Sequence, residues 1–377
     1  MLGFVSLFMD MSSEMAHAVL PIFLTVTLGT SVATVGFIDG IAEAVAQVMK
    51  LASGSLSDAL RSRKWLAVLG YGLSALAKPL FPIAASVDGV LAARIVDRVG
   101  KGIRGSPRDA MVADMTPPEQ RGAAYGLRQA LDTVGAVVGP LLAILALGLW
   151  QWDVRSVLWL ACLPSVVAVL VLVFAVAEPE RRVSGPARDM VRTGWTQLGK
   201  GFWLVLALAA LVAAARLSEA FLVLKAQAVA MPLALVPAVM IVMSAVYAAS
   251  SYPAGVIADA TGQRGLFGGA LAALFAAHGL LALGNGVAAV IAGSALWGLH
   301  MGLSQGLLSK MVADTAPVAL RGRCFGLYYF ASGAATLAAA TVAGVLWDRS
   351  GPALAFGFGA VLTTGALALL LSQRRAA

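Results

Sequence analysis

The first apolar stretch of the chain carries three side chains that can bind or release a proton. Asp10, Glu14 and His17 are spaced four and three residues apart, so a helix places them on one face. A charge in the hydrocarbon core of a membrane costs about 2.5 kcal/mol or more unless it faces a partner or water. A carboxyl group in such a place can take up or lose a proton when its neighbours rearrange. We predict a proton or substrate site on this face, with a static ion pair between helices as the alternative.

Charged side chains of both signs recur inside later apolar stretches. Asp39 and Glu43 lie one helical turn apart in the second stretch, and the seventh stretch carries Arg216 and Glu219. The spacing of the last two also allows a pair that only neutralises itself. Because buried charges need partners or water, we predict one polar central cavity. Its proton- and substrate-binding residues are predicted to be Asp10, Glu14, His17, Asp39, Glu43, Arg216 and Glu219.

Signatures of enzymes and of ATP-driven pumps are absent from the sequence. It contains no H-E-x-x-H or G-x-x-x-x-G-K-[ST] motif. We therefore expect no enzymatic activity and no cofactor, and the driving energy must come from a gradient. Met9, Met11, Met15 and His17 are soft ligands of the kind that suits copper(I), but methionine is also an ordinary apolar filler. We predict no metal site.

The composition identifies the elements that must position these groups. Of the 377 residues, 60% are hydrophobic and 12% are charged, whereas a soluble domain is about one quarter charged. A membrane-spanning helix takes about 20 apolar residues, so the chain has room for about twelve. We expect an all-α polytopic membrane protein with twelve transmembrane helices. They are predicted at 3–27, 31–53, 65–86, 88–106, 121–148, 154–177, 201–224, 234–254, 265–284, 286–309, 322–346 and 351–372.

The two halves of the chain repeat each other. Met-Val-Ala-Asp at 111–114 recurs at 311–314, and Arg-Gly at 121–122 recurs with the same spacing at 321–322. An even number of helices in each half makes the two repeats parallel, related by an axis along the membrane normal. We expect the central cavity between these halves. The predicted domains are an N-terminal six-helix half at 1–177, a linker at 178–200 and a C-terminal six-helix half at 201–377.

The basic residues predict the orientation of the chain in the membrane. Nearly all lysines and arginines of the loops fall on one side, whereas the other side receives only Arg155 and Arg349. Loops rich in lysine and arginine stay in the cytoplasm. We therefore expect a multi-pass protein of the bacterial inner membrane with both termini and the linker in the cytoplasm. The net charge of +8 then reflects topology, and no nucleic-acid partner is predicted.

Several motifs resemble the major facilitator superfamily of secondary transporters. The loops GSLSDALRSRK at 54–64 and GVIADATGQR at 255–264 are similar to the family's G-x-L-a-D-r-x-G-r-k loop. GAVVGP at 135–140 is similar to the antiporter-type G-x-x-x-G-P signature of export members. The run DRVGKGIRGSPRD at 97–109, together with the acidic residues of 10–14, resembles a broad prokaryotic subgroup that includes drug and nickel exporters.

The resemblance implies a gate near the second and eighth helices. Its gating residues are predicted to be Asp58, Arg94, Asp97, Arg98, Lys101, Asp259 and Arg264. A conformational hinge is predicted at Gly135, Gly139 and Pro140, because small residues let helices approach closely and proline removes a backbone hydrogen bond.

These observations predict a secondary transporter that exports a small molecule, coupled to protons, by alternating access. The expected partners are the substrate, protons and the lipid bilayer, and we expect a monomer. Export of a divalent or soft metal ion is an alternative that rests on the subgroup resemblance. An importer or a uniporter is a further alternative, since the sequence encodes direction poorly. A membrane receptor or enzyme would need an added domain or a catalytic constellation, and neither occurs.

Overall fold

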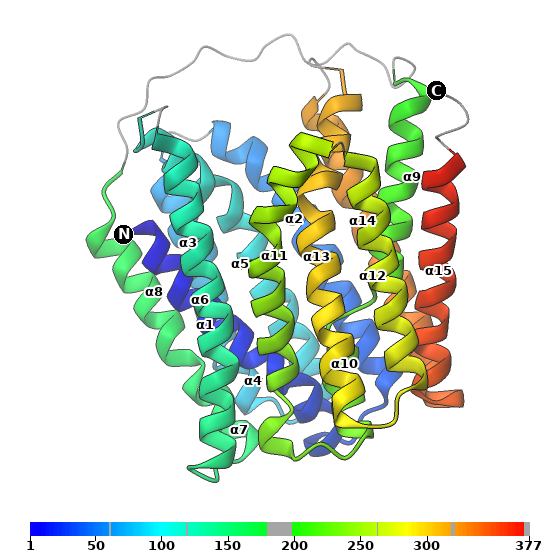
Figure 1. The fold of residues 1–377 in the computed structure, drawn as a ribbon. Helices are drawn as coiled ribbons and strands as arrows, with labels where there is room; N and C mark the ends of the chain where they lie inside the picture. The colour runs from blue at the N-terminus through cyan, green and yellow to red at the C-terminus, as the bar shows by residue number, and fades with distance from the viewer. Residues whose placement is uncertain (60–61, 118–119, 179–197, 262, 318–320, 373–377) are drawn as a thin grey trace.

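The described part of the chain folds into helices joined by short connections (Figure 1). The computed structural model describes residues 1–59, 62–117, 120–178, 198–261, 263–317 and 321–372. No strand occurs among these residues. Eleven helical segments of this described part are long and apolar enough to cross a membrane. The predicted all-α polytopic membrane fold is confirmed.

The helices follow the predicted apolar stretches in order. The first half contains α1 (Leu2–Ile22), η1 (Phe23–Thr27), α2 (Val32–Ala59), α3 (Arg63–Ala77), α4 (Leu80–Ile83), α5 (Val87–Asp114), α6 (Arg121–Gly148), α7 (Val154–Leu160) and α8 (Cys162–Ala175). The second half contains α9 (Lys200–Ala215), α10 (Ala220–Ala228), η4 (Leu233–Leu235), α11 (Ala238–Thr261), α12 (Gln263–Leu283), α13 (Val287–Thr315), α14 (Arg321–Ser350) and α15 (Pro352–Ser372). Helix α5 corresponds to the predicted fourth span but is not among the eleven apolar segments. Charged side chains recur along it and lower its hydropathy.

The internal repeat falls at equivalent places in the two halves. The tetrapeptide at 111–114 forms the end of α5, and its copy at 311–314 forms the end of α13. Both helices run past the ends predicted from their apolar stretches, to Asp114 and Thr315. We call the end of the bundle at which α5, α13 and α15 finish the terminal end, and the other the opposite end (Figure 1).

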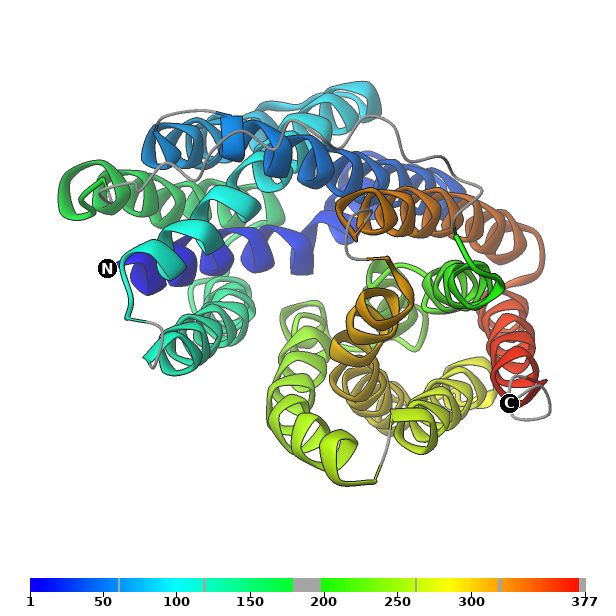
Figure 2. The same ribbon diagram turned by 90° about the horizontal axis from the view of Figure 1, so that it is seen from above.

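The helices form two groups, α1 to α8 and α9 to α15, which meet along two pairs of helices (Figure 2). Helix α2 packs against α14, and α6 packs against α11. Glycines allow α2 and α14 to touch through their backbones: a Cβ atom added at Gly40 would lie 2.9 Å from the Cα atom of Leu337. The division into halves joined by a linker stays a prediction, since 179–197 lies outside the described residues.

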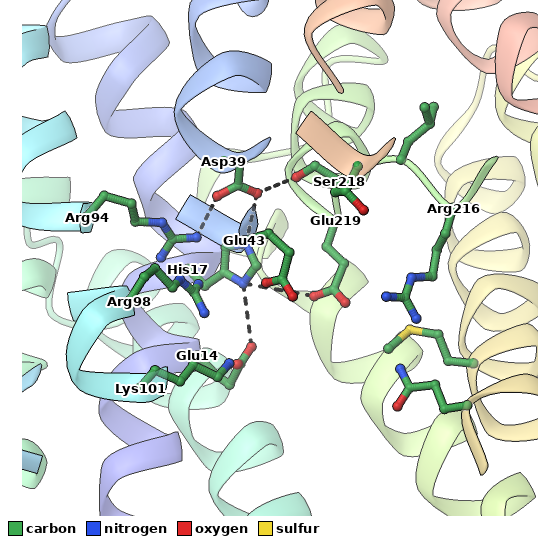
Figure 3. Close-up of a pocket in the computed structure, with 14 residues that line it drawn as sticks. Glu14, His17, Asp39, Glu43, Arg94, Arg98, Lys101, Arg216, Ser218 and Glu219 are labelled. Atoms are coloured by element: carbon green, nitrogen blue, oxygen red, sulfur yellow. Dashed lines mark hydrogen bonds and ion pairs between the residues drawn. The ribbon is translucent and has the colours of Figure 1, made fainter. Parts of the chain in front are cut away.

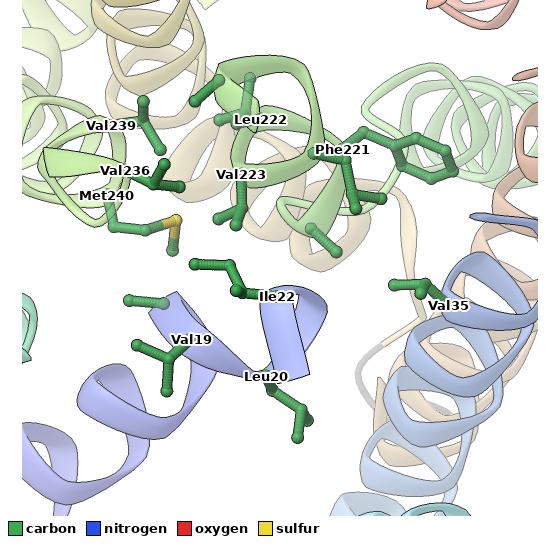
Figure 4. Packing of buried hydrophobic residues seen from close by; sticks show 14 of the residues in the cluster. Val19, Leu20, Ile22, Val35, Phe221, Leu222, Val223, Val236, Val239 and Met240 are labelled. Carbon is green, nitrogen blue, oxygen red and sulfur yellow. The ribbon is translucent and has the colours of Figure 1, made fainter. Parts of the chain in front are cut away.

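An apolar cluster joins the two groups at the opposite end, and we call it the apolar seal. Val19 and Ile22 of α1 belong to this cluster together with Val223 of α10, and all three side chains are buried (Figure 4). Two other clusters of the described residues each stay within one group, one between 2 and 176 and one between 198 and 370. Apolar packing therefore closes the opposite end more than the terminal end.

A carboxylate from one group also caps a helix of the other group. Asp348 of α14 accepts hydrogen bonds from the backbone amides of Val32 at 2.9 Å and Ala33 at 2.8 Å. These amides lie at the start of α2, where the first N–H groups of a helix have no partner within the helix. The cap fixes α2 to α14 in the arrangement that the structure adopts.

Candidate functional site

A polar cavity of about 260 Å³ lies between the two groups of helices (Figure 3). Helices α1, α2 and α5 line one side, and α13, α14 and the break between α9 and α10 line the other. Its described lining residues are Glu14, His17, Asp39, Glu43, Arg94, Arg98, Lys101, Arg216, Leu217, Ser218, Glu219, Met301, Gln305 and Thr336. Leu217 and Met301 are the apolar members of this set, so the wall presents mainly charges and hydrogen-bonding groups.

His17 lies among three carboxylates at the centre of this wall. Its Nδ1 atom is 3.8 Å from Glu14 Oε2 and 3.9 Å from Glu219 Oε2, and its Nε2 atom is 3.5 Å from Asp39 Oδ2. The first two distances are too long for hydrogen bonds, so these contacts are electrostatic. Glu14 and Asp39 belong to one group of helices and Glu219 to the other. The His17 ring therefore makes contacts with both groups.

Asp39 is the best-partnered carboxylate of the cavity. Arg94 Nη2 donates a hydrogen bond to Asp39 Oδ1 at 2.5 Å, and the hydroxyl of Ser218 donates to Oδ2. Ser218 lies at the break between α9 and α10, so this bond also joins the two groups. With His17 nearby as well, Asp39 has little capacity left for a ligand.

Other charges of the cavity have no ion-pair partner in the part of the chain that the structure describes. These are Arg98, Lys101 and Arg216, and none of them lies within 4.0 Å of a carboxylate oxygen. Arg98 is 7% exposed, and its Nε atom has no hydrogen-bond partner among the described residues. Glu43 accepts one hydrogen bond, from Gln47 Nε2 at 2.6 Å. A buried charge without a partner is costly, so these groups favour a polar occupant.

A break in the seventh passage brings three polar residues to the cavity. Helix α9 ends at Ala215, and Leu217 then adopts a left-handed backbone conformation with φ of 47°. A residue with a side chain rarely takes this conformation, so the surroundings must hold it. The Ser218 hydroxyl accepts a hydrogen bond from the backbone amide of Ala220 at 3.1 Å, which starts α10. The break turns Arg216, Ser218 and Glu219 toward the cavity (Figure 3).

Two side chains bond backbone carbonyls that lie just before this break. His278 of α12 is fully buried, and its Nε2 atom lies 2.9 Å from the carbonyl oxygen of Ala215. Thr336 of α14 donates a hydrogen bond to the carbonyl oxygen of Ala213 at 3.4 Å. The last carbonyls of a helix lack partners within it, and in a membrane other groups must satisfy them. These bonds therefore stabilise the break.

Two predicted site residues lie beside the cavity and do not line it. Asp10 lies 3.8 Å from Arg104 through Oδ1 and Nη2. Asp97 accepts a hydrogen bond from Lys78 Nζ at 3.0 Å. Arg94, Arg98 and Lys101, which are predicted as gating residues together with Asp97, line the cavity.

The predicted hinge residues lie where α6 crosses α1. A Cβ atom added at Gly135 would lie 3.0 Å from the Met11 amide nitrogen, and one at Gly139 would lie 2.9 Å from that of Met15. Pro140 follows inside the same helix. The side chains of three predicted gating residues lie outside the described part of the chain, namely Asp58, Asp259 and Arg264.

Five residues that line the cavity were not predicted from the sequence. These are Leu217, Ser218, Met301, Gln305 and Thr336. Gln305 and Thr336 are polar side chains inside apolar stretches, and that signal could have found them. Ser218 lies beside Glu219, and its role became visible only through its bond to Asp39.

Three ligand-type side chains of the cavity lie close enough together to hold a metal ion. Donor atoms of Glu14, His17 and Glu219 all lie within 4.8 Å of one another. The methionines of the first helix contribute little to such a site. Met9 and Met15 are fully buried and pack in two different apolar clusters.

Comparison with known proteins identifies the family. The model of the Major Facilitator Superfamily matches residues 2–224. The chain belongs to the major facilitator superfamily. An uncharacterized MFS-type transporter of Methanocaldococcus jannaschii is 30% identical over 98% of this chain and 93% of that relative. The protein is therefore a membrane transporter of this family.

Solved structures and partial relatives of this MFS transporter agree with the assignment. The nucleoside transporter NupG superposes with a TM-score of 0.79 over 98% of this chain and 97% of that one. At 14% identity this likeness concerns the fold. The multidrug resistance protein MdtH of Photorhabdus laumondii is 30% identical over a shorter segment, 35% of this chain and 32% of that protein.

Proposed function

We propose that the protein is a proton-coupled transporter that exports a small polar molecule through the central cavity by alternating access. The observation that carries this proposal is the position of His17, whose ring lies between Glu14 of its own helix and Glu219 of the other group. A titratable group that contacts both groups can link its protonation to their relative position.

The proposed coupling depends on the repulsion between Glu14 and Glu219. A charged His17 offsets that repulsion and favours the arrangement in which the two groups approach each other. Transfer of its proton, or protonation of either carboxylate, changes this balance. The proton thereby shifts the equilibrium between two states to the extent that it binds them unequally.

The remaining predicted residues take supporting roles in this proposal. Glu43 and Arg216 bind substrate, Asp39 joins the groups through Ser218, and Asp10 adjusts the charge beside the cavity. Asp97 acts in gating together with Asp58, Asp259 and Arg264. This role rests on the sequence and on the family resemblance alone. Gly135, Gly139 and Pro140 act as the hinge. Arg94, Arg98 and Lys101 balance the carboxylates of the cavity while its walls rearrange.

The described arrangement fits a cavity that takes up substrate from the cytoplasm, and one relative favours export as the direction. The apolar seal and the Asp348 cap close the opposite end, so the cavity would load from the terminal end. The distribution of lysine and arginine assigns the terminal end to the cytoplasm of an inner membrane. The partial relative MdtH is named for multidrug resistance, which is consistent with efflux. We propose that the transporter acts as a monomer.

Export of a divalent metal ion is the second candidate, because Glu14, His17 and Glu219 offer three clustered ligand atoms. Carboxylate and imidazole are common ligands for divalent transition metals. The electrostatics of the wall weigh against it. Arg94, Arg98, Lys101 and Arg216 line the same cavity and would repel a dication.

Proton movement in proteoliposomes tests the proposal. Vesicles containing the wild type and a pH-sensitive dye receive amino acids, short peptides, sugars, nucleosides, Ni²⁺, Fe²⁺ or Cu⁺, one class at a time. Glu14→Gln and His17→Gln are compared with Arg349→Gln, which removes an exposed charge at the opposite end. We expect one organic class to move protons with the wild type and Arg349→Gln, and at least tenfold more slowly with Glu14→Gln.

The other outcomes discriminate the alternatives. Substrate that crosses without proton movement contradicts the coupling and identifies a uniporter. A signal with metal ions alone supports the second candidate. An imposed pH gradient of either sign, with substrate loaded on either side, distinguishes export from import.

A further inference from the structure

We infer that the substrate is a small zwitterion of about amino-acid size, with its carboxylate on Arg216 and its ammonium group among Glu14, Glu43 and Glu219. This inference rests on the proposed transport through the central cavity and specifies the class of molecule that the cavity accepts. It is carried by three features of the described wall: the balance of charge, the groups of both signs that lack a hydrogen-bonded ion pair, and the size and polarity of the space.

The charges of the wall balance each other. Four carboxylates line the cavity, namely Glu14, Asp39, Glu43 and Glu219. Four basic side chains besides His17 line it as well, namely Arg94, Arg98, Lys101 and Arg216. A ligand with one net charge would leave an excess of that sign in a poorly solvated space. A ligand that carries one charge of each sign keeps the balance and can satisfy unpaired groups of both kinds.

The second group of helices supplies a place for the carboxylate. Arg216 has no ion-pair partner within the described residues, and its side chain points into the cavity (Figure 3). Gln305 lines the same side, and its amide oxygen accepts a hydrogen bond from the Tyr247 hydroxyl at 3.1 Å. The Gln305 amide group is thereby left to donate. Arg216 and the Gln305 amide group together present hydrogen-bond donors to the cavity, which suits a carboxylate.

Carboxylates in the centre of the cavity supply a place for the ammonium group. Glu14 and Glu219 both lie near Nδ1 of His17, at distances longer than hydrogen bonds. Glu43 keeps one of its oxygens free of the Gln47 bond. These acceptors match the three donors of an ammonium group. A zwitterion held in this way touches Glu14 and Glu43 of one group and Arg216 of the other, so its binding favours approach of the two groups.

The size and polarity of the cavity exclude larger and flatter molecules. Its volume of about 260 Å³ lies below that of ordinary drug sites, which take about 300–1,000 Å³. No aromatic side chain occurs among the described lining residues, so a planar base has no stacking surface. Arg98 lines the space, is 7% exposed and has an Nε atom without a hydrogen-bond partner among the described residues. Such a side chain indicates a space that holds polar matter.

Binding of matched ligands to the purified full chain tests the inference. Thermal unfolding in detergent is followed with each of the twenty amino acids, and the best of them gives the affinity by calorimetry. For a leucine-like hit, 4-methylpentanoate lacks the ammonium group and 3-methylbutylamine lacks the carboxylate, at nearly the same size. We expect the amino acid to stabilise the protein and both single-charge analogues to bind at least tenfold more weakly.

Variants locate the two ends of the bound molecule. Arg216→Gln is expected to weaken amino-acid binding about ten- to a hundredfold, because a charged hydrogen bond is lost. Tyr247→Phe leaves Arg216 in place and is expected to weaken binding by a smaller factor. Arg349→Gln is the matched loss of an arginine outside the cavity and should bind as the wild type does.

Separate outcomes overturn the inference and the proposed function. If Ni²⁺ or a single-charge analogue stabilises the protein and no amino acid does, the zwitterion is overturned. Proton coupling still stands when those ligands move protons in vesicles. Amino-acid binding that Arg216→Gln does not weaken also overturns it. Amino-acid binding without proton movement in vesicles supports the zwitterion and contradicts the coupling.

Discussion

Lys78 Nζ and Asp97 Oδ1 lie 3.0 Å apart, and neither side chain is more than 4% exposed. Lys78 also donates to the hydroxyl of Ser13 at 3.2 Å. The pair joins α3, α5 and α1 beside the cavity and away from its wall. This arrangement predicts that Asp97 contributes to the stability of the fold. That contribution can be tested against the gating role that the family resemblance implies.

Replacement of one partner of the Lys78–Asp97 pair is expected to be costly. Asp97→Asn leaves the Lys78 ammonium group buried without a counter-charge, which should lower the free energy of unfolding by about 3–5 kcal/mol. Thermal unfolding in detergent measures this loss. The double variant Lys78→Met with Asp97→Leu removes both charges and should regain most of the stability. Loss of transport by Asp97→Asn at unchanged stability would contradict the structural role and support gating.

Removal of the Asp348 cap is expected to open the end that the structure holds closed. Asp348→Ala removes the acceptor for the Val32 and Ala33 amides, which costs about 1 kcal/mol and corresponds to a shift of about fivefold in the equilibrium. A Val223→Cys reporter in the apolar seal, in a chain without its two native cysteines, should react about fivefold faster with an impermeant maleimide added at the opposite end. Ser350→Ala, two residues away and exposed, is the control. Equal labelling of both variants would show that the cap does not hold the closed state.

His278 is expected to matter for transport through the backbone that it bonds. His278→Ala leaves the Ala215 carbonyl without its side-chain partner at the break that positions Arg216 and Glu219, a loss of about 1–3 kcal/mol. His300 is the matched control, because it is equally buried and bonds the carbonyl of Ala270 at 2.9 Å, away from the break. Substrate-dependent proton movement should fall about tenfold further with His278→Ala than with His300→Ala. If His278→Ala and His300→Ala lose stability and transport to the same extent, His278 has no specific role at the break.

Close packing between α1 and α6 predicts an asymmetric response of glycines to substitution. A larger residue at Gly139 would meet the Met15 backbone, whereas Gly72 of α3 has no atom within 4 Å of an added Cβ. We expect Gly139→Val to lower the unfolding temperature clearly and Gly72→Val to change it little, since overpacking costs about 1–3 kcal/mol. Transport by Gly139→Ala at a fixed expression level then tests the hinge. A rate close to that of the wild type would argue against a hinge at this crossing.

Much of the fold and part of the candidate site followed from local patterns. The apolar stretches placed the membrane passages, since a span in lipid must be apolar and helical. Helical spacing grouped Glu14 with His17 and Asp39 with Glu43, and all four line the cavity. The internal repeat at 111–114 and 311–314 marked equivalent helix ends.

Other features depend on contacts that no local pattern contains. Asp97 lies about 60° around α5 from the stripe of Arg94, Arg98 and Lys101, by a helical turn of about 3.6 residues, so it faces Lys78 while they face the cavity. The cap between Asp348 and α2 joins residues more than 300 positions apart. No glycine or proline lies near the break at Leu217 to mark it in the sequence. The break is held by hydrogen bonds from side chains of other helices to the carbonyls of Ala213 and Ala215.

The equal number of acidic and basic side chains on the cavity wall has an electrical consequence. Moving one elementary charge across a potential of 100 mV changes the free energy by about 2.3 kcal/mol. Four carboxylates and four lysines or arginines line the described cavity, so their fixed charges sum to zero apart from His17. When the two groups of helices rock around this wall, the membrane potential does almost no work on the protein itself. The voltage then acts on the proton and the substrate that the cavity carries, so we expect the potential to affect mainly the steps in which the cavity crosses with a net charge bound.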